Sequence, residues 1–188
     1  GLCLYSAIVI ASTFSQNTFA YDGHGFTVFL AAPVELGRVL LAKNVVHAAG
    51  AFLIAGVEAA FYVVYFRHGT RLDVLAALLG VAALVPVLLA AGNFLSLYFP
   101  VKFHANLARR DKLPFAASML GVAAAAVGAA PFSAALRMRV KDGVDLGTVA
   151  LLAACAAATW MLYRLTLPLA MRLLVQRREV VLRAVTRE

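Results

Sequence analysis

Four long apolar runs are the feature that most restricts the fold of this 188-residue chain. A run of about 20 apolar residues forms a helix long enough to cross the ~30 Å hydrocarbon core of a bilayer. Because lipid offers no partner to backbone N–H and C=O groups, an apolar run of this length crosses as a helix. The sequence therefore predicts an all-α, polytopic transmembrane bundle with full spans at residues 45–66, 74–98, 114–136 and 147–171.

Composition agrees with a membrane location and argues against a nucleic-acid-binding protein. The chain is 63% hydrophobic and 14% charged, whereas soluble domains are about 45–50% apolar and about 25% charged. The formal net charge of +8 comes from basic residues that flank the apolar runs. Basic flanks of this kind contact anionic lipid headgroups and set topology. We expect membrane lipid as a partner, and no nucleic acid.

The first residues read as an incomplete span. Residues 1–13, "GLCLYSAIVIAST", contain only about a dozen apolar residues before polar ones begin, short of the ~20 that a span needs. They also lack the basic front region of a signal peptide. We expect the end of a fifth span here, so that residues 1–188 form one transmembrane domain that is the C-terminal portion of a longer protein.

Residues 14–44 have a different character from the rest of the chain. They contain a Gly-rich turn, the short apolar strip "FTVFLAA", and then Pro33, which can occupy the first turn of a helix. Glu35 follows, near the positive helix N-terminus. We predict an interfacial helix that leads into the span at residue 45. Its inner face presses apolar side chains on the membrane surface while the Lys43 stem snorkels; this face consists of Leu36, Val39, Leu40 and Lys43.

The distribution of Lys and Arg predicts the orientation. Segments 14–44, 99–113 and 172–188 would share one side of the membrane and carry eleven Lys and Arg residues. The opposite side carries five. Because short cytoplasmic loops are enriched in basic residues, we place the 14–44 segment and the 172–188 tail in the cytoplasm.

Three stretches resemble a known family. Residues 29–43, "FLAAPVELGRVLLAK", are similar to the "L-L-x-x-P-V-x-x-x-x-I-L-x-x-K" pattern between spans two and three of ATP-binding cassette (ABC) type 2 transporter permeases. Residues 92–103, "GNFLSLYFPVKF", resemble the "GN-x-x-S-x-x-F-P-x-R" pattern of one bacterial branch. Ala42 and Lys102 stand where that family often has glycine and arginine. The tail "RREVVLRAVTRE" is similar as well.

The resemblance implies a six-span permease half in the bacterial cytoplasmic membrane, carrying a substrate that the sequence does not name. It implies two protein partners, a cytoplasmic ABC ATPase subunit and a second permease half, identical or not. ATP would be bound by the ATPase, since this chain has no G-x-x-x-x-G-K-[ST] P-loop. We expect no catalytic residue, cofactor or metal in the chain. The ATPase-coupling residues implied are Asp22, Phe26, Phe29, Pro33, Glu35, Arg38 and Lys43.

Polar residues inside the spans are a second set of candidates. Glu58 lies in the second half of the 45–66 span, where a charged side chain costs about 2.5–3.5 kcal/mol or more. Asn93 and Ser96 are three residues apart and so lie on one helix face. We interpret all three as either part of a substrate path or polar contacts between helices.

Two other classes of function stay open. A membrane-embedded lipid-modifying enzyme would need polar groups that converge near the interface, and the residues available for it are Asp22, His24, His104 and Asp111. A non-catalytic assembly subunit would need none. Copurification with an ATPase whose turnover depends on the chain distinguishes transport from both.

Overall fold

The computed structural model describes residues 2–15, 18–19, 22, 25–66, 70–101, 114–138 and 144–186, and six helices account for nearly all of these. Four of the helices are long and apolar enough to cross a membrane, which confirms the predicted all-α bundle. The helices are α1 (Leu2–Ser15), α2 (Gly25–Ala31), α3 (Leu36–Phe66), α4 (Arg71–Tyr98), α5 (Phe115–Met138) and α6 (Leu146–Thr186).

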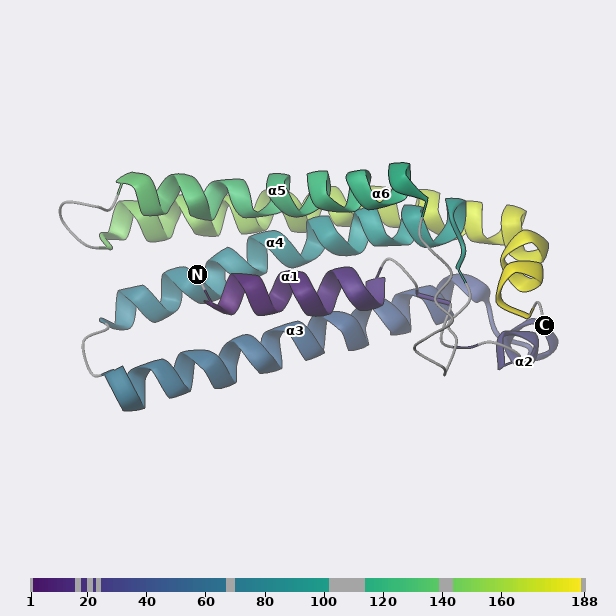
Figure 1. Ribbon diagram of the computed structural model, residues 1–188, viewed down its shortest axis with the longest axis horizontal. Helices are drawn as coiled ribbons and strands as arrows, with labels where there is room; N and C mark the ends of the chain where they lie inside the picture. The colour runs from purple at the N-terminus through teal and green to yellow at the C-terminus, as the bar shows by residue number, and fades with distance from the viewer. Residues whose placement is uncertain are drawn as a thin grey trace.

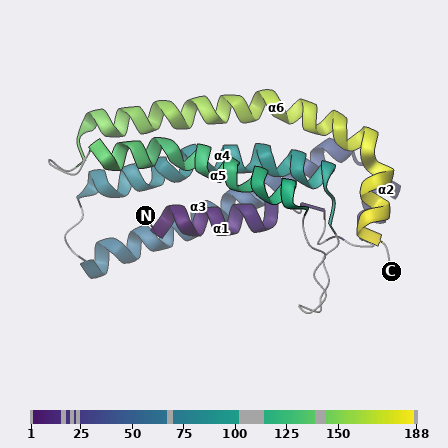
Figure 2. The ribbon, with the colours of Figure 1, turned by 45° about the horizontal axis from the view of Figure 1, so that its top comes forward.

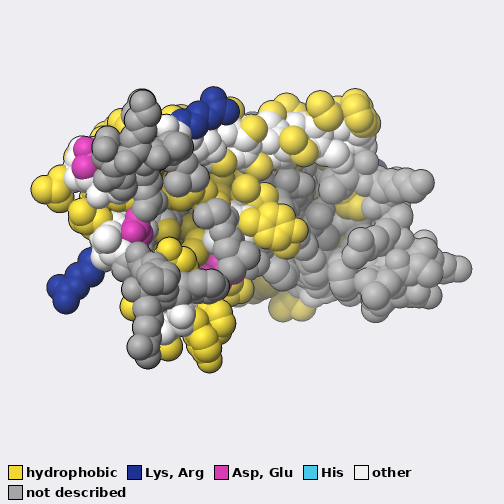
Figure 3. Space-filling model, turned by 60° about the vertical axis from the view of Figure 1, so that its left-hand side comes forward, with side chains coloured by type: hydrophobic (Ala, Val, Ile, Leu, Met, Phe, Trp, Pro, Cys, Tyr) yellow, Lys and Arg dark blue, Asp and Glu magenta, His cyan; other side chains and the backbone are white. Residues whose placement is uncertain are grey.

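Helix α4 is the centre of the bundle. It packs against α1, α3, α5 and α6, and Figure 1 shows it between the α5–α6 layer and the α1–α3 layer. Half of its most apolar 18-residue window is buried, against 17–22% for the other three spanning helices. The outer helices therefore direct most of their apolar side chains away from the protein. Figure 3 shows such side chains over much of the described surface, with the charged ones toward one end. This is the surface expected of a protein surrounded by lipid.

Small residues allow α4 and α5 to lie close together. A Cβ atom added to Gly80 of α4 would lie 2.6 Å from the ring of Phe132 on α5. One added to Gly128 of α5 would lie 2.6 Å from a methyl group of Leu84 on α4. Each glycine thus makes room for a large buried side chain of the facing helix, which is how helices approach closely in membranes.

The predicted interfacial helix and the span that follows it form one continuous helix. Helix α3 starts at Leu36 and continues without a break to Phe66. All of the strip "FTVFLAA" except its last residue, Ala32, belongs to α2, a separate short helix. Pro33 lies in the bend between α2 and α3, not in the first turn of α3. With the proline before the helix, nothing interrupts the backbone hydrogen bonds of α3 between Leu36 and Phe66.

The helix that contains the last predicted span continues beyond residue 171. Helix α6 extends through most of the expected tail to Thr186, and Figure 2 shows it bending toward α2 in its second half. Pro168 inside the helix removes one backbone donor. Two turns before the tail, the Thr166 hydroxyl donates to the carbonyls of Leu162 and Tyr163, both at 3.0 Å. Hydroxyl bonds of this kind also bend helices.

Two hydrophobic clusters hold the fold together. One lies along the middle of the bundle and includes Val81, Leu84, Leu88 and Phe132. The other lies at the end where α2 meets the last turns of α6 (Figure 2). The second cluster fixes α2 to the bundle, and it consists of Phe19, Phe26, Val39, Leu40, Leu97, Ala170, Leu174, Val181 and Val185.

Candidate coupling site

A tight turn positions α2 beside the start of α3. The backbone N–H of Asp22 donates to the Phe19 carbonyl at 3.1 Å, and that of Gly25 donates to the Asp22 carbonyl at 2.7 Å. The rings of Phe19 and Phe26 meet edge to face with centroids 5.2 Å apart. The aromatic pair and the turn therefore anchor α2 to the second cluster.

Lys43 is paired inside the protein and does not snorkel as predicted. Its Nζ lies 2.8 Å from the carboxylate of Asp22, and both side chains are at most one-fifth exposed. The same ammonium lies 5.6 Å from the ring centroid of Phe19 and 5.9 Å from that of Phe29. A cation over aromatic faces is stabilised further by their quadrupoles. Asp22 offers a closer, oppositely charged partner than the headgroup region, so the stem turns inward.

The face that was predicted to press on the membrane is buried in the protein. Leu40 and Phe26 are fully buried and Val39 nearly so, because the end of α6 and the Phe19 turn cover them. Phe26, expected as an apolar anchor for a partner, instead contacts this chain's own core. Phe29 is half-buried and keeps one side toward the outside.

The exposed tip of this region carries the charges expected for docking. Pro33, Val34, Glu35 and Arg38 are all exposed. The Arg38 Nε lies 3.1 Å from the Glu35 carboxylate, with side chains 77% and 75% exposed. The Glu35 carbonyl also accepts the first backbone bond of α3, from Arg38 N–H at 2.9 Å. An ion pair this exposed contributes about 0–1 kcal/mol, so a partner can separate it at little cost.

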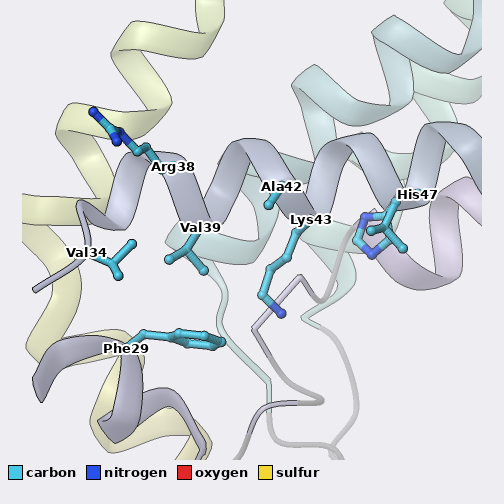
Figure 4. Close-up of a pocket in the computed structure, with 8 residues that line it drawn as sticks. Phe29, Val34, Arg38, Val39, Ala42, Lys43 and His47 are labelled. Carbon is cyan, nitrogen blue, oxygen red and sulfur yellow. The ribbon is translucent and has the colours of Figure 1, made fainter. Parts of the chain in front are cut away.

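An open groove of about 550 Å³ runs along α3 opposite α2. In Figure 4, Phe29 of α2 faces Val39 and Lys43 of α3, whereas the Arg38 side chain points away from Phe29 and Val34 lies in the bend before α3. Among the described residues, the lining combines apolar and basic side chains and includes no acidic one. Its members are Phe29, Val34, Arg38, Val39, Ala42, Lys43, Val46 and His47.

The sequence did not predict a buried polar contact that lies next to Lys43. Asn44 Nδ2 donates to the Tyr163 hydroxyl of α6 at 3.0 Å, and the Tyr163 ring meets Trp160 edge to face at 5.7 Å. Lys43 thus links α3 to the α2 turn, and the next residue links α3 to α6. The one sequence feature that could have indicated this contact is the polar Asn44, directly before the apolar run 45–66.

The polar residues inside the predicted spans form hydrogen bonds, one between two helices and one within a helix. The Ser6 hydroxyl of α1 donates to the Glu58 carboxylate of α3, so Glu58 makes a polar contact between helices, one of its two predicted roles. The Ser96 hydroxyl donates to the Asn93 carbonyl of its own helix at 3.1 Å. The Asn93 side chain is 1% exposed, and its amide has no hydrogen-bond partner among the described residues.

The structure describes only one of the four residues that a lipid-modifying enzyme would need. Asp22 is engaged with Lys43, and His24, His104 and Asp111 lie outside the described residues. Within the described part of the chain, no three His, Cys, Asp or Glu side chains come together as metal ligands do.

Comparison of the chain with protein-family models, with curated proteins and with solved structures finds no match. The resemblance to ABC type 2 permeases therefore stays a prediction.

Proposed function

We propose that the chain is the membrane-spanning permease subunit of an ABC transporter of the bacterial cytoplasmic membrane. ATP hydrolysis by a separate cytoplasmic subunit would drive movement of its substrate, and a second permease half would complete the pathway. The chain itself would not hydrolyse ATP.

The proposal rests on one observation: the end of the bundle formed by α2 and the start of α3 has an exposed tip and is attached to the spans by buried polar contacts. A lever between an ATPase and a bundle needs an exposed contact surface and a firm attachment to the spans. The tip with Val34, Glu35 and Arg38 supplies the first. The Asp22–Lys43 ion pair supplies the second, together with the Asn44–Tyr163 hydrogen bond. A partner that contacts two states of this end differently could shift the bundle between them.

The test is the effect of the chain on an ATPase that copurifies with it from native membranes. In proteoliposomes that contain both, we expect ATP turnover to depend on the chain. We expect the double variant Phe29→Ala/Arg38→Ala to lose most of that dependence, on the order of tenfold, because interface energy is concentrated in aromatic and Arg side chains. The variant should still insert into the membrane.

The matched control is Phe61→Ala/Arg137→Ala, which removes one aromatic and one basic side chain that are also exposed but lie near the ends of α3 and α5, at the opposite end of the bundle (Figure 1). It should keep the native turnover. The docking role of the tip is wrong if both double variants behave alike. Phospholipid-modifying activity of the chain alone would support the enzyme alternative instead.

A further inference from the structure

We infer that Asn44, Asn93 and Tyr163 form a binding site for one water molecule inside the bundle, where α3, α4 and α6 meet. The water would donate a hydrogen bond to Asn44 Oδ1 and accept hydrogen bonds from Asn93 Nδ2 and from the Tyr163 hydroxyl. This site belongs to the chain alone and does not rest on transport.

Asn44 and Asn93 lie at the same level of the bundle. Helices α3 and α4 are consecutive and antiparallel (Figure 1). Asn44 lies 22 residues before the last residue of α3, and Asn93 lies 22 residues after the first residue of α4. One turn closer to α2, Leu40 of α3 and Leu97 of α4 belong to the same buried cluster. Because residues four apart share a helix face, each asparagine follows its leucine into the shared interior.

Tyr163 brings α6 to the same level. Its hydroxyl accepts a hydrogen bond from Asn44 Nδ2 at 3.0 Å. One turn further along α6, Leu167 packs against both hydrophobic clusters, so this face of α6 covers the contact between α3 and α4. The side chains of Asn44, Asn93 and Tyr163 are at most 5% exposed.

Three amide atoms at this level have no hydrogen-bond partner among the described residues. They are Asn44 Oδ1, Asn93 Oδ1 and Asn93 Nδ2. A buried amide without a partner lowers stability, and a buried water typically makes about three hydrogen bonds to such groups. The Tyr163 hydroxyl accepts from Asn44, so its own O–H is a further donor.

These groups complement a water molecule better than an ion or a larger solute. One acceptor and two donors match a molecule that both donates and accepts. The three side chains carry no charge to balance that of an ion, and their burial leaves a larger solute no way in. Asn93 Oδ1 would keep no partner, which a buried carbonyl tolerates better than an N–H group does.

The first experiment is a double-mutant cycle, measured by thermal unfolding of the full chain in detergent. Asn44→Leu and Asn93→Leu each keep a branched side chain of similar size and remove the amide. Each should lower the unfolding temperature by about 2–4 °C or more, because the water loses a partner. The double variant should lose clearly less than both shifts together, since the second substitution acts on a site that no longer holds the water.

Two outcomes of this cycle overturn the inference. If the Asn93 amide is simply unpaired, Asn93→Leu raises the unfolding temperature, because an apolar side chain replaces an unsatisfied polar one. If the shifts of Asn44→Leu and Asn93→Leu add, no bound molecule joins the two amides.

The second experiment identifies the bound molecule as water, and the unmodified chain suffices for it. Under intense X-rays, ordered water yields hydroxyl radicals that oxidise adjacent side chains, and mass spectrometry locates the oxidation. We expect oxidation of Tyr163 despite its burial, and a several-fold loss of it in Asn93→Leu. The matched control is Ser96→Ala, since this buried hydroxyl donates to a carbonyl of its own helix. It should leave Tyr163 oxidation unchanged.

Phe132 provides the reference for a dry position, since it is 6% exposed and lies in the apolar cluster along the middle of the bundle. Tyr163 in the unmodified chain that is as protected from oxidation as Phe132 would overturn the inference, and it would leave a direct contact between the asparagines to explain any coupling. No ATPase is present in either assay, so their failure leaves the transport proposal standing.

Discussion

At the scale of residues, some buried polar groups in the described part of the chain each meet one specific partner, whereas the Asn93 amide meets none there. The hydroxyl of Tyr163 and the amide of Asn44 meet in a buried contact at 3.0 Å. Asp22 and Lys43 form a largely buried ion pair. A buried site holds little water to replace a lost partner, so each pair fixes the position of the segments that bear it.

We expect Tyr163→Phe to destabilise the chain by about 1–3 kcal/mol, because Asn44 Nδ2 would remain buried without an acceptor. Thermal unfolding in detergent measures the effect. Tyr65→Phe is the matched control, since Tyr65 is 69% exposed, and it should unfold at the native temperature. Equal stability of the two variants would mean that the Asn44 contact contributes nothing.

A hydrogen bond at the start of α6 makes the stability of the fold depend on pH through one residue, Asp145. Thr148 N–H donates to the Asp145 carboxylate at 2.7 Å. Hydrogen bonds from Thr148, through its side chain and then its backbone, lower the pKa of Asp145 below its ordinary 3.8. A lowered folded-state pKa means that the stabilisation is fully present above the unfolded-state pKa and is lost as pH falls through the folded-state pKa.

We therefore expect Asp145→Ala to unfold at a lower temperature than the native chain at neutral pH. The difference should shrink on acidification below about pH 4. Asp145→Asn keeps a capping side chain without a titrating group, so its stability should not follow this pH dependence. A difference between Asp145→Ala and the native chain that grows toward low pH would contradict the assignment.

At the scale of elements, the sequence predicted the spans better than the segments between them. The cores of α3, α4, α5 and α6 follow from hydropathy alone. Their ends do not follow from hydropathy, because α3 begins before its apolar run, in the segment predicted as an interfacial helix, and α6 continues past its apolar run; both extensions are amphipathic turns. Those turns are helical because tertiary contacts bury Leu40, Leu174 and Val181, and such contacts cannot be read from local composition. The Lys43–Asp22 pairing was missed for the same reason, since it joins residues 21 positions apart.

Close packing of α4 on α5 gives a prediction at this scale. Gly80→Ala should destabilise the chain by about 1–3 kcal/mol, because the new methyl group would overlap the buried Phe132 ring. Gly56→Ala is the control, since a Cβ at Gly56 meets nothing within 4 Å. Its better helix propensity should leave stability equal or slightly higher. The α4–α5 contact is loose if Gly80→Ala unfolds at the native temperature.

At the scale of the whole molecule, the topology inferred from basic residues is consistent with the architecture. Helix α2, the start of α3 and the end of α6 gather at one end of the bundle, while the starts of α4 and α6 lie at the other (Figure 1). The sequence predicted this arrangement because an even number of crossings returns the chain to the same side. Which side faces the cytoplasm follows from the positive-inside rule alone.

Cysteine labelling tests the orientation. In a background with Cys3→Ala and Cys155→Ala, we introduce Glu35→Cys at the α2–α3 tip or Leu146→Cys at the start of α6, both exposed positions. A membrane-impermeant maleimide should label Glu35→Cys in inside-out vesicles and Leu146→Cys in right-side-out vesicles. The reverse pattern would place the tip outside the cell and exclude the coupling role.

The cluster that joins α2 to the end of α6 also dictates the order in which the fold can be completed during synthesis. Phe26 and Leu40 emerge from the ribosome before Val181 and Val185, which belong to the same cluster but follow 141 to 159 residues later. Until then, the apolar side chains of α2 and the start of α3 that α6 later covers are exposed to the membrane surface or to chaperones. A nascent chain stalled before residue 181 would contain all four candidate spans. The apolar side chains of α2 and the start of α3 would not yet be covered by the end of α6.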